Sequence, residues 1–424
     1  MKSPNSLLQF FVFCLFVSLF PGLPIYEPAH AQISQTVMIS PGDDIQALVT
    51  QHDRGTTFLL TKGIYRRQSI TPKANNAFIG QPGAILSGAQ LVTNFTKQNQ
   101  NWVAQDQRQQ GPRFGTCEMN RVIPPATTCM FPEDLFLDDV LLTQVTTLSE
   151  VSPGKWYFDY KADEIIMADD PSGRKVEASI TPRAFQGSAP NVLIQGLIIE
   201  KYASPAQEAA IHGQTGRAGL RSRNWIVQEN EVRWNHAMGI RLGEEMHIRK
   251  NFIHHNGQFG IGGSGKNILI EENEISFNNN QGFHWHTAGG TKFVGTVNLL
   301  VRHNFVHDNF GPGLWSDVDN LNTLYENNHV KNNQTQGIFH EASYDAIIRN
   351  NLVEGNGFGD SIWHVGSGIL VSSSPNVEIY NNQVINNADG IGLIQVHTRV
   401  EGRFGPRELK NSSVHDNIIA MTEG

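Results

Sequence analysis

The chain has 424 residues, so it is long enough for one large domain or two ordinary ones. Its formal net charge is -8 at pH 7, which argues against nucleic acid or an anionic membrane as its partner. No stretch beyond the N-terminal region is apolar enough to span a bilayer.

The N-terminal segment has the pattern of a secretory signal peptide. Lys2 is followed by the apolar run Leu7–Phe20, which is shorter than a full membrane span. Prolines and the triplet AHA at Ala29–Ala31 follow, as they do before a cleavage site. We therefore expect residues 1–31 to be removed. The mature protein is then secreted, to the extracellular space or the periplasm, and makes no contact with the membrane.

Residues 32–101 predict the beginning of a stack of short strands. Ile45, Leu48 and Val49 have helical spacing, and this helix is expected to cap the N-terminal end of the stack, where strand edges would otherwise lie open. Two segments after it, 58–73 and 76–89, have the pattern of short strands joined by glycine turns.

Residues 102–186 interrupt this pattern and predict an inserted β-rich subdomain. The segment contains the two cysteines that remain after signal cleavage, Cys117 and Cys129, and in an oxidising compartment we expect them to form a disulfide. A hairpin (LFLDDVLL) and the aromatic strand KWYFDY follow. The subdomain either extends one wall of a cleft or only packs against the stack.

From residue 187 to 424 the sequence repeats, which is its strongest signal. Asparagine recurs in one series, and a second asparagine follows five residues later in all but the last repeat. The first series is Asn230, Asn251, Asn273, Asn304, Asn328, Asn351, Asn382 and Asn417. Glycines that open the next strand are spaced 21 to 24 residues apart, with two spacings of 31 that mark insertions. Short strands separated by Asn and Gly bends predict an all-β fold, the right-handed parallel β-helix, in which stacked turns share one core. We interpret the asparagines as structural bend residues.

The glycines allow the side chains of each turn to be sorted by direction, because direction alternates along a strand. The residue after each glycine is apolar throughout and is expected to point inward. One expected outward column is Arg241, Gly262, His284, Trp315, Phe339, Leu370 and Gly392, and the next is Gly243, Ser264, His286, Asp317, Glu341, Ser372 and Ile394. Adjacent turns stack about 4.8 Å apart. His286, Asp317 and Glu341 should therefore form one row, in which the paired acids require a cation or a shared proton.

Three long loops are expected to border this face. The insertion 287–296 follows the strand of His286, the insertion 357–366 contains Trp363, and the loop 396–409 contains Arg399, Arg403 and Arg407. Loops on a rigid scaffold often carry binding residues, and arginines suit carboxylate or sulfate groups. We expect Trp315, His284, Phe339, Arg241 and Trp363 to contact substrate.

The capping helix and the Asn/Gly repeats resemble the pectate-lyase-like superfamily of secreted β-helix proteins. Its calcium-dependent pectate lyases place D-x-D on one turn and E-x-x-x-D on the next. This chain has Asp317-x-Asp319 followed by Glu341-x-x-x-Asp345. The resemblance implies that these four acids hold calcium, whose preferred ligands are hard oxygens, against a uronate. It also implies an arginine base. No arginine lies on this face in the next two turns, so Arg399 or Arg403 would have to reach back from its loop.

The leading hypothesis is a calcium-assisted lyase of an anionic polysaccharide with no organic cofactor. A glycoside hydrolase or a polymer epimerase could use the same pair, Asp317 and Glu341, with His286 or the inward-facing, hydrogen-bonded His340 tuning proton affinity. The third alternative is a non-catalytic carbohydrate-binding or surface structural protein. Sequence spacing does not separate these alternatives.

Overall fold

The computed structural model describes residues 35–117, 128–213, 219–359 and 364–421. The expected signal peptide and Trp363 lie outside these ranges. Among the described residues, no helix is long and apolar enough to cross a membrane.

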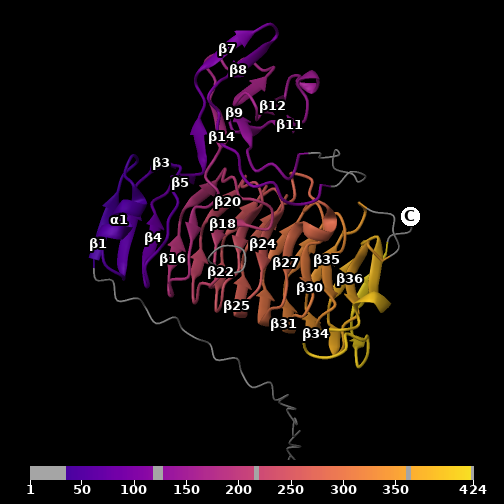
Figure 1. Ribbon diagram of the computed structural model, residues 1–424. Coiled ribbons are helices and arrows are strands. Elements are labelled where there is room, and N and C mark those ends of the chain that lie inside the picture. Colours follow the sequence, from indigo (N-terminus) through magenta and orange to yellow (C-terminus); the bar gives the residue numbers. More distant parts are fainter. Residues whose placement is uncertain (1–34, 118–127, 214–218, 360–363, 422–424) are drawn as a thin grey trace, which may run out of the picture. The chain divides into compact units, whose positions relative to one another are not determined.

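Three parallel sheets, A, B and C, wind around one core, as the right-handed parallel β-helix requires (Figure 1). Sheet A comprises, in spatial order, β1 (Gln35–Ile39), β2 (Thr56–Leu60), β4 (Ala77–Gly80), β16 (Leu193–Gln195), β19 (Ile226–Gln228), β22 (His247–Arg249), β25 (Lys266–Glu271), β28 (Val297–Arg302), β31 (Leu321–Glu326), β34 (Tyr344–Arg349), β37 (Val377–Tyr380) and β40 (Ser413–His415). Sheet B comprises β3 (Gly63–Arg66), β5 (Ala84–Ser87), β17 (Ile198–Glu200), β20 (Glu231–Arg233), β23 (Phe252–His254), β26 (Glu274–Ser276), β29 (Phe305–His307), β32 (His329–Lys331), β35 (Leu352–Glu354), β38 (Gln383–Ile385) and β41 (Ile418–Ala420). Sheet C comprises β15 (Phe185–Gln186), β18 (Ala209–His212), β21 (Met238–Arg241), β24 (Phe259–Gly263), β27 (Gly289–Phe293), β30 (Leu314–Asp317), β33 (Ile338–Glu341), β36 (Ser367–Ser372) and β39 (Asp389–Ile394).

The helix α1 (Ile45–Gln51) lies at the N-terminal end of the stack beside β1 (Figure 1). Asp44 caps it, because its carboxylate accepts a 2.9 Å hydrogen bond from the backbone N–H of Ala47. Ile45 and Val49 are buried in the same apolar cluster as the first strands of the stack. The predicted helical cap is therefore confirmed.

Asparagine ladders run through the interior bends. In the first ladder, the side-chain oxygen of Asn251 accepts from the backbone N–H and side-chain amide of Asn230, at 3.0 and 3.1 Å. The same pair of bonds links every following asparagine of that series. A second ladder links Asn235 to Asn387 in the same way. The structural interpretation of these residues is therefore confirmed.

The inserted subdomain consists of two antiparallel or mixed sheets with a core of their own. Its strands are β6 (Ala89–Leu91), β7 (Phe95–Gln98), β8 (Asn101–Ala104), β9 (Leu135–Leu137), β10 (Val140–Leu141), β11 (Thr143–Val145), β12 (Lys155–Asp159), β13 (Glu164–Met167) and β14 (Val176–Ser179). The subdomain begins before the predicted boundary at 102, because β6 already pairs with β14. It ends before 186, because β15 pairs with β18 of sheet C.

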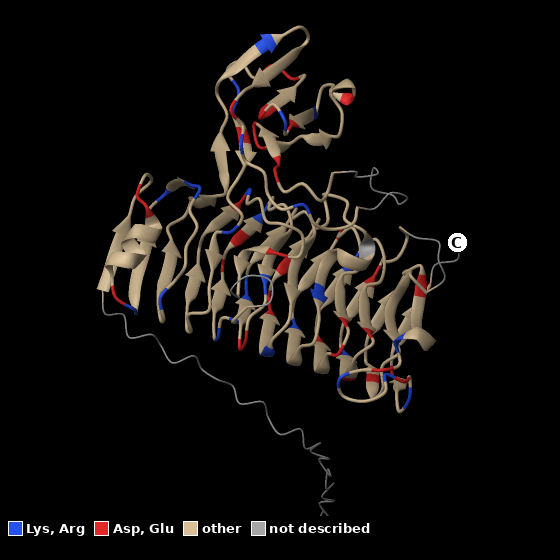
Figure 2. Ribbon diagram, viewed as in Figure 1, with Lys and Arg blue, Asp and Glu red and all other residues tan. Residues whose placement is uncertain are grey.

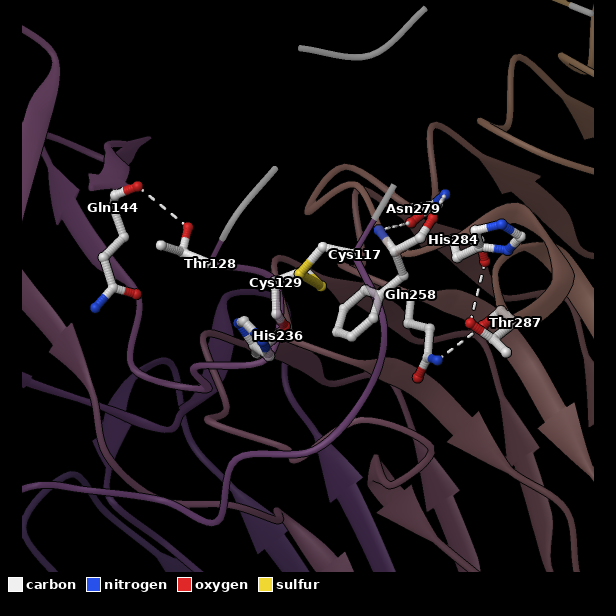
Figure 3. The surroundings of a disulfide bond; sticks show 10 residues. Cys117, Thr128, Cys129, Gln144, His236, Gln258, Asn279, His284 and Thr287 are labelled. Carbon is white, nitrogen blue, oxygen red and sulfur yellow. Dashed lines mark hydrogen bonds between the residues drawn. A yellow bond between two sulfur atoms is a disulfide. The ribbon is translucent and has the colours of Figure 1, made fainter. Parts of the chain in front are cut away.

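The disulfide between Cys117 and Cys129 is present, with a Cα–Cα distance of 5.6 Å. Beside it, the buried His236 joins the stack to the inserted chain (Figure 3). Its Nδ1 lies 3.1 Å from an oxygen of Asp134, and its Nε2 lies 2.8 Å from the carbonyl oxygen of Cys129. Burial lowers the pKa of His236, but the charge and hydrogen bond of Asp134, the hydrogen bond to Cys129 and the charge of Glu133 together outweigh burial, so the net shift is upward. Both ring nitrogens can therefore donate from a protonated ring.

Candidate active site

The outward columns of sheet C differ from the prediction at one turn. β27 begins at Gly289, and the strand register pairs Gly262 with Lys292. The insertion, which was predicted at 287–296 after this strand, therefore precedes the strand. Lys292 occupies the column position that the sequence analysis assigned to His284, and Val294 continues the column at the position assigned to His286.

The cause of this error is that Gly282 and Gly290 both satisfy the repeat. A side chain on a true repeat glycine would meet the asparagine ladder of the next turn. A Cβ atom on Gly290 would lie 2.9 Å from the amide nitrogen of Asn309, and one on Gly313 would lie 2.8 Å from that of Asn333. The spacing of glycines in the sequence does not reveal this steric requirement. Gly282 fits the spacing as well as Gly290 does, so the wrong glycine was chosen.

His284 and His286 consequently lie in the loop 279–288, near the disulfide and not on sheet C (Figure 3). The backbone N–H of His284 donates to the carbonyl oxygen of Thr116 at 2.9 Å. The ring centroids of the two histidines are 4.8 Å apart. The carbonyl oxygen of His286 accepts a 2.6 Å hydrogen bond from Lys292, which lies in the predicted row.

Asp317 and Glu341 form the expected pair on adjacent strands. They are register partners at the ends of β30 and β33, so their backbones lie about 4.8 Å apart. Arg399, from the short helix His397–Arg399, bridges them: one guanidinium nitrogen lies 2.6 Å from Asp317, and the other binds Glu341. The predicted reach of Arg399 from its loop is thus seen in the structure.

Two further donors complete this cluster. Lys292 Nζ lies 2.9 Å from the second oxygen of Asp317, and Trp315 Nε1 donates to the second oxygen of Glu341 at 3.2 Å. All four carboxylate oxygens therefore have a partner from the chain. The side chains of Lys292, Asp317 and Glu341 are only 16%, 11% and 13% exposed, whereas that of Arg399 is 30% exposed.

Burial perturbs the proton affinities in this cluster. It raises the pKa of Glu341, and the neighbouring charge of Asp317 raises it further, while Arg399 and Lys292 act in the opposite direction. Burial also lowers the pKa of Lys292, and Asp317 and Glu341 only partly offset that effect. The cluster therefore contains an acid that holds its proton more tightly than usual beside an amine that holds it less tightly.

Trp315 and Phe339 do not present ring faces to solvent. They are 2% and 5% exposed, and their rings stack with centroids 5.7 Å apart. Lys292 Nζ covers Trp315 at 3.5 Å from the ring centroid. Both faces of the Trp315 ring are therefore already packed, and neither is open for the substrate contact that we expected of this residue. Its polar edge instead orients Glu341.

The four predicted calcium ligands do not come together. Asp345 lies on sheet A, exposed, and accepts a 2.7 Å hydrogen bond from Asn376. Asp319 binds Arg407 at 2.9 Å and the backbone N–H of Arg403 at 3.0 Å. In the described ranges, no three His, Cys, Asp or Glu residues form a group that could hold a metal ion. The sequence therefore contains the D-x-D and E-x-x-x-D spacings, but the four acids do not surround a common point. The bend after β33 places Asp345 on sheet A, away from Asp317 and Glu341.

The remaining candidates lie apart from the acid pair. The exposed side chain of Arg403 lies over the ring of Phe404, at 5.1 Å from its centroid. Arg241 binds the carbonyl oxygen of Gln207, three strands before Asp317. His340 is buried inside the stack, and within the described structure neither ring nitrogen has a hydrogen-bond partner, contrary to the prediction. Burial lowers the pKa of His340 to about 3, so its ring is neutral.

Comparisons with known proteins agree with this fold. A family model described as the right handed beta helix region matches residues 219–368. No curated protein sequence matches the chain. The solved structure of XylC in complex with xylose is similar, with a TM-score of 0.65 and 15% identity over 82% of this chain, which spans 66% of the length of that protein.

Two other solved structures superpose more loosely, and we draw nothing further from them. A polygalacturonase from Erwinia carotovora subsp. carotovora has a TM-score of 0.45 and 9% identity over 93% of this chain and 98% of its own. The A-module of a mannuronan C-5 epimerase from Azotobacter vinelandii has a TM-score of 0.43 and 12% identity over 91% of this chain and 96% of its own. Identities this low establish fold and leave activity open. The chain therefore has the right-handed parallel β-helix fold, and its residues 219–368 match the right handed beta helix region.

Proposed function

We propose that the protein is a carbohydrate-active enzyme, and specifically a retaining glycoside hydrolase that uses Asp317 and Glu341. The observation that carries this proposal is the placement of two buried carboxylates in register on adjacent strands, bridged by one guanidinium. Retaining enzymes need carboxyl groups about 5–5.5 Å apart, whereas inverting enzymes need about 6.5–9.5 Å. The strand spacing of about 4.8 Å favours the shorter separation.

The surroundings of the two acids suggest different roles. Asp317 forms ion pairs with two cations, Lys292 and Arg399, and we assign it the role of nucleophile. Glu341 binds one cation and the Trp315 N–H, and its raised pKa favours the protonated form, as a general acid requires. In the proposed reaction Asp317 attacks the anomeric carbon while Glu341 protonates the leaving oxygen. Glu341 then removes a proton from the water that releases the sugar from Asp317.

Substrate entry requires a change in this cluster. Every carboxylate oxygen already has a partner, and the Arg399 guanidinium bridges the two acids where the sugar has to bind. Arg399 is the partner that the two acids share, the most exposed member, and the one supplied by a loop. We propose that the guanidinium withdraws when the substrate enters.

The lyase remains the second candidate, because one observation favours it. Lys292 is a buried amine whose pKa is lowered, and a neutral amine could remove the proton beside a uronate carboxylate. Calcium would then need ligands other than the predicted four, since Asp345 lies on another sheet. The disulfide and the signal-like N-terminus support a secreted protein under either candidate.

The test is a panel of aryl glycosides and of neutral and uronate polysaccharides, assayed with and without a chelator. For a hydrolase we expect new reducing ends without unsaturated product. Asp317→Asn and Glu341→Gln should each lower kcat about 10²–10⁴-fold. The matched control, Asp345→Asn, removes an acid outside the cluster and should retain activity. Unsaturated product would support the lyase, and full activity in both cluster variants would refute the proposal.

A further inference from the structure

We infer that the Asp317/Glu341 site accepts only the end of a sugar chain, so that the enzyme acts on short oligosaccharides or terminal residues. This inference rests on the proposed function and narrows its substrate class.

The face of sheet C is covered on the N-terminal side of the acid pair. Met238 and Phe259, which form an apolar cluster with Ala209 apart from the core of the stack, are 4% and 3% exposed, and His212 is fully buried. Such burial of an outer face requires chain packed on it. We call the segments 203–208 and 279–288 the upstream cover.

Gln258, at the start of β24, ties the two segments of this cover together. Its side-chain oxygen accepts from the backbone N–H of Gln207 at 2.6 Å, and its amide donates to the carbonyl oxygen of Thr287 at 2.7 Å. Figure 3 shows Gln258 and Thr287 joined beside the disulfide. Ala206 and Phe283 share a small apolar cluster with Cys117 and Cys129, so the disulfide anchors both segments. The upstream cover is therefore held in place by side-chain hydrogen bonds and by packing against the disulfide.

The loop 396–409, which we call the strap, closes the other side. Besides the contacts of Arg399, Arg407 binds Asp319 at 2.9 Å. The hydroxyl of Tyr344 donates to the carbonyl oxygen of Gly405 at 2.6 Å, and its ring meets Phe404 edge-on. Figure 2 shows basic and acidic residues side by side in the loops next to the last turns, where this segment lies.

The exposed part of the face is short. Val294 is 37% exposed, Arg399 is 30% exposed at its side chain, and Asp317 and Glu341 lie between them. On the C-terminal side, the outward residues Leu370 and Ser372 of β36 are 2% and 1% exposed. With the half-buried Ser264 one turn before Val294, the open stretch covers about four turns, or roughly 14 Å between the outer strands. This length fits a chain end and is too short for an extended polymer.

The test uses two inactive variants, Asp317→Asn and Glu341→Gln, and two probe series, 1,4-linked xylo-oligosaccharides and oligogalacturonides of one to six residues. Calorimetry should show affinity that rises over the first two or three residues of at least one series and then stays constant. The wild-type enzyme should release only the terminal sugar unit at the earliest time points. Affinity that keeps rising to six residues, products of mixed length, or no binding in either series would overturn the inference. Constant affinity beyond three residues without turnover by the wild type would instead refute the hydrolase proposal while leaving the end-binding site in place.

Discussion

Arg399→Met provides a strict test of the described cluster, because it removes the one group that joins both acids. Methionine keeps much of the side-chain length and removes the charge. Each charge-assisted hydrogen bond contributes about 1.5–3 kcal/mol, so the two bonds give roughly 3–6 kcal/mol before correction. Arg399 is 30% exposed, and Lys292 still neutralises Asp317. We therefore expect the variant to lose about 2–3 kcal/mol of local stability.

Hydrogen exchange measured by mass spectrometry should show this loss in peptides that cover the strap. A change of 2–3 kcal/mol corresponds to exchange about 30- to 150-fold faster, after correction for intrinsic rates. The matched control is Arg403→Met on the same loop. The Arg403 side chain is exposed and lies over Phe404, so its removal should cost less than about 1 kcal/mol.

The effect should also depend on pH, and its sign follows from the pKa of Glu341. That pKa is raised above the ordinary value of 4.5, so the folded state is penalised as pH rises and the carboxyl ionises. Arg399 offsets this penalty. The difference between variant and wild type should therefore be smaller at low pH, where Glu341 is protonated, than above the folded pKa of Glu341. Equal exchange in Arg399→Met and Arg403→Met at pH 8 would refute the reasoning.

The remaining predictions concern the scaffold. Asn304→Ala should lower the free energy of unfolding by about 3 kcal/mol, because the buried backbone N–H of Asn273 and carbonyl of Ile270 lose their partner. Denaturant unfolding should show this loss. The control Asn94→Ala, at an exposed position, should change the free energy of unfolding by less than about 0.5 kcal/mol. Similar changes in the free energy of unfolding for both variants would contradict the role of the ladder. The raised pKa of His236 predicts stabilisation that is complete below pH 6.5 and lost as pH rises through the folded value. The melting temperature of His236→Asn should lack this pH-dependent stabilisation. A pH dependence of the melting temperature identical to that of the wild type would contradict the role of His236.

Much of the fold could be predicted because every turn of the stack has the same steric and hydrogen-bonding requirements. Each turn needs a ladder asparagine at the bend and a glycine where a Cβ atom would meet the next ladder residue. These requirements appear in the sequence as asparagines and glycines that recur at regular spacings. The inserted subdomain has no period, so its ends at Ala89 and Ser179 became visible only through strand pairing.

The site was predictable only where it follows the repeat. Asp317 and Glu341 share a column because both lie at a fixed distance from a repeat glycine. Lys292 was missed because the insertion before β27 could be placed on either side of that strand. The signal that could have revealed it is the pair Gly289-Gly290, followed by the alternation of Thr291, Lys292 and Phe293. The reach of Arg399 depends on loop geometry, which no spacing encodes.

The central claim is that Asp317 and Glu341 act together as nucleophile and acid in a retaining hydrolysis. Proton NMR of the first product, recorded before mutarotation with a substrate identified in the panel, tests it most directly. We expect the released sugar to keep the anomeric configuration of the substrate. Inversion of that configuration, or formation of an unsaturated sugar, would contradict it.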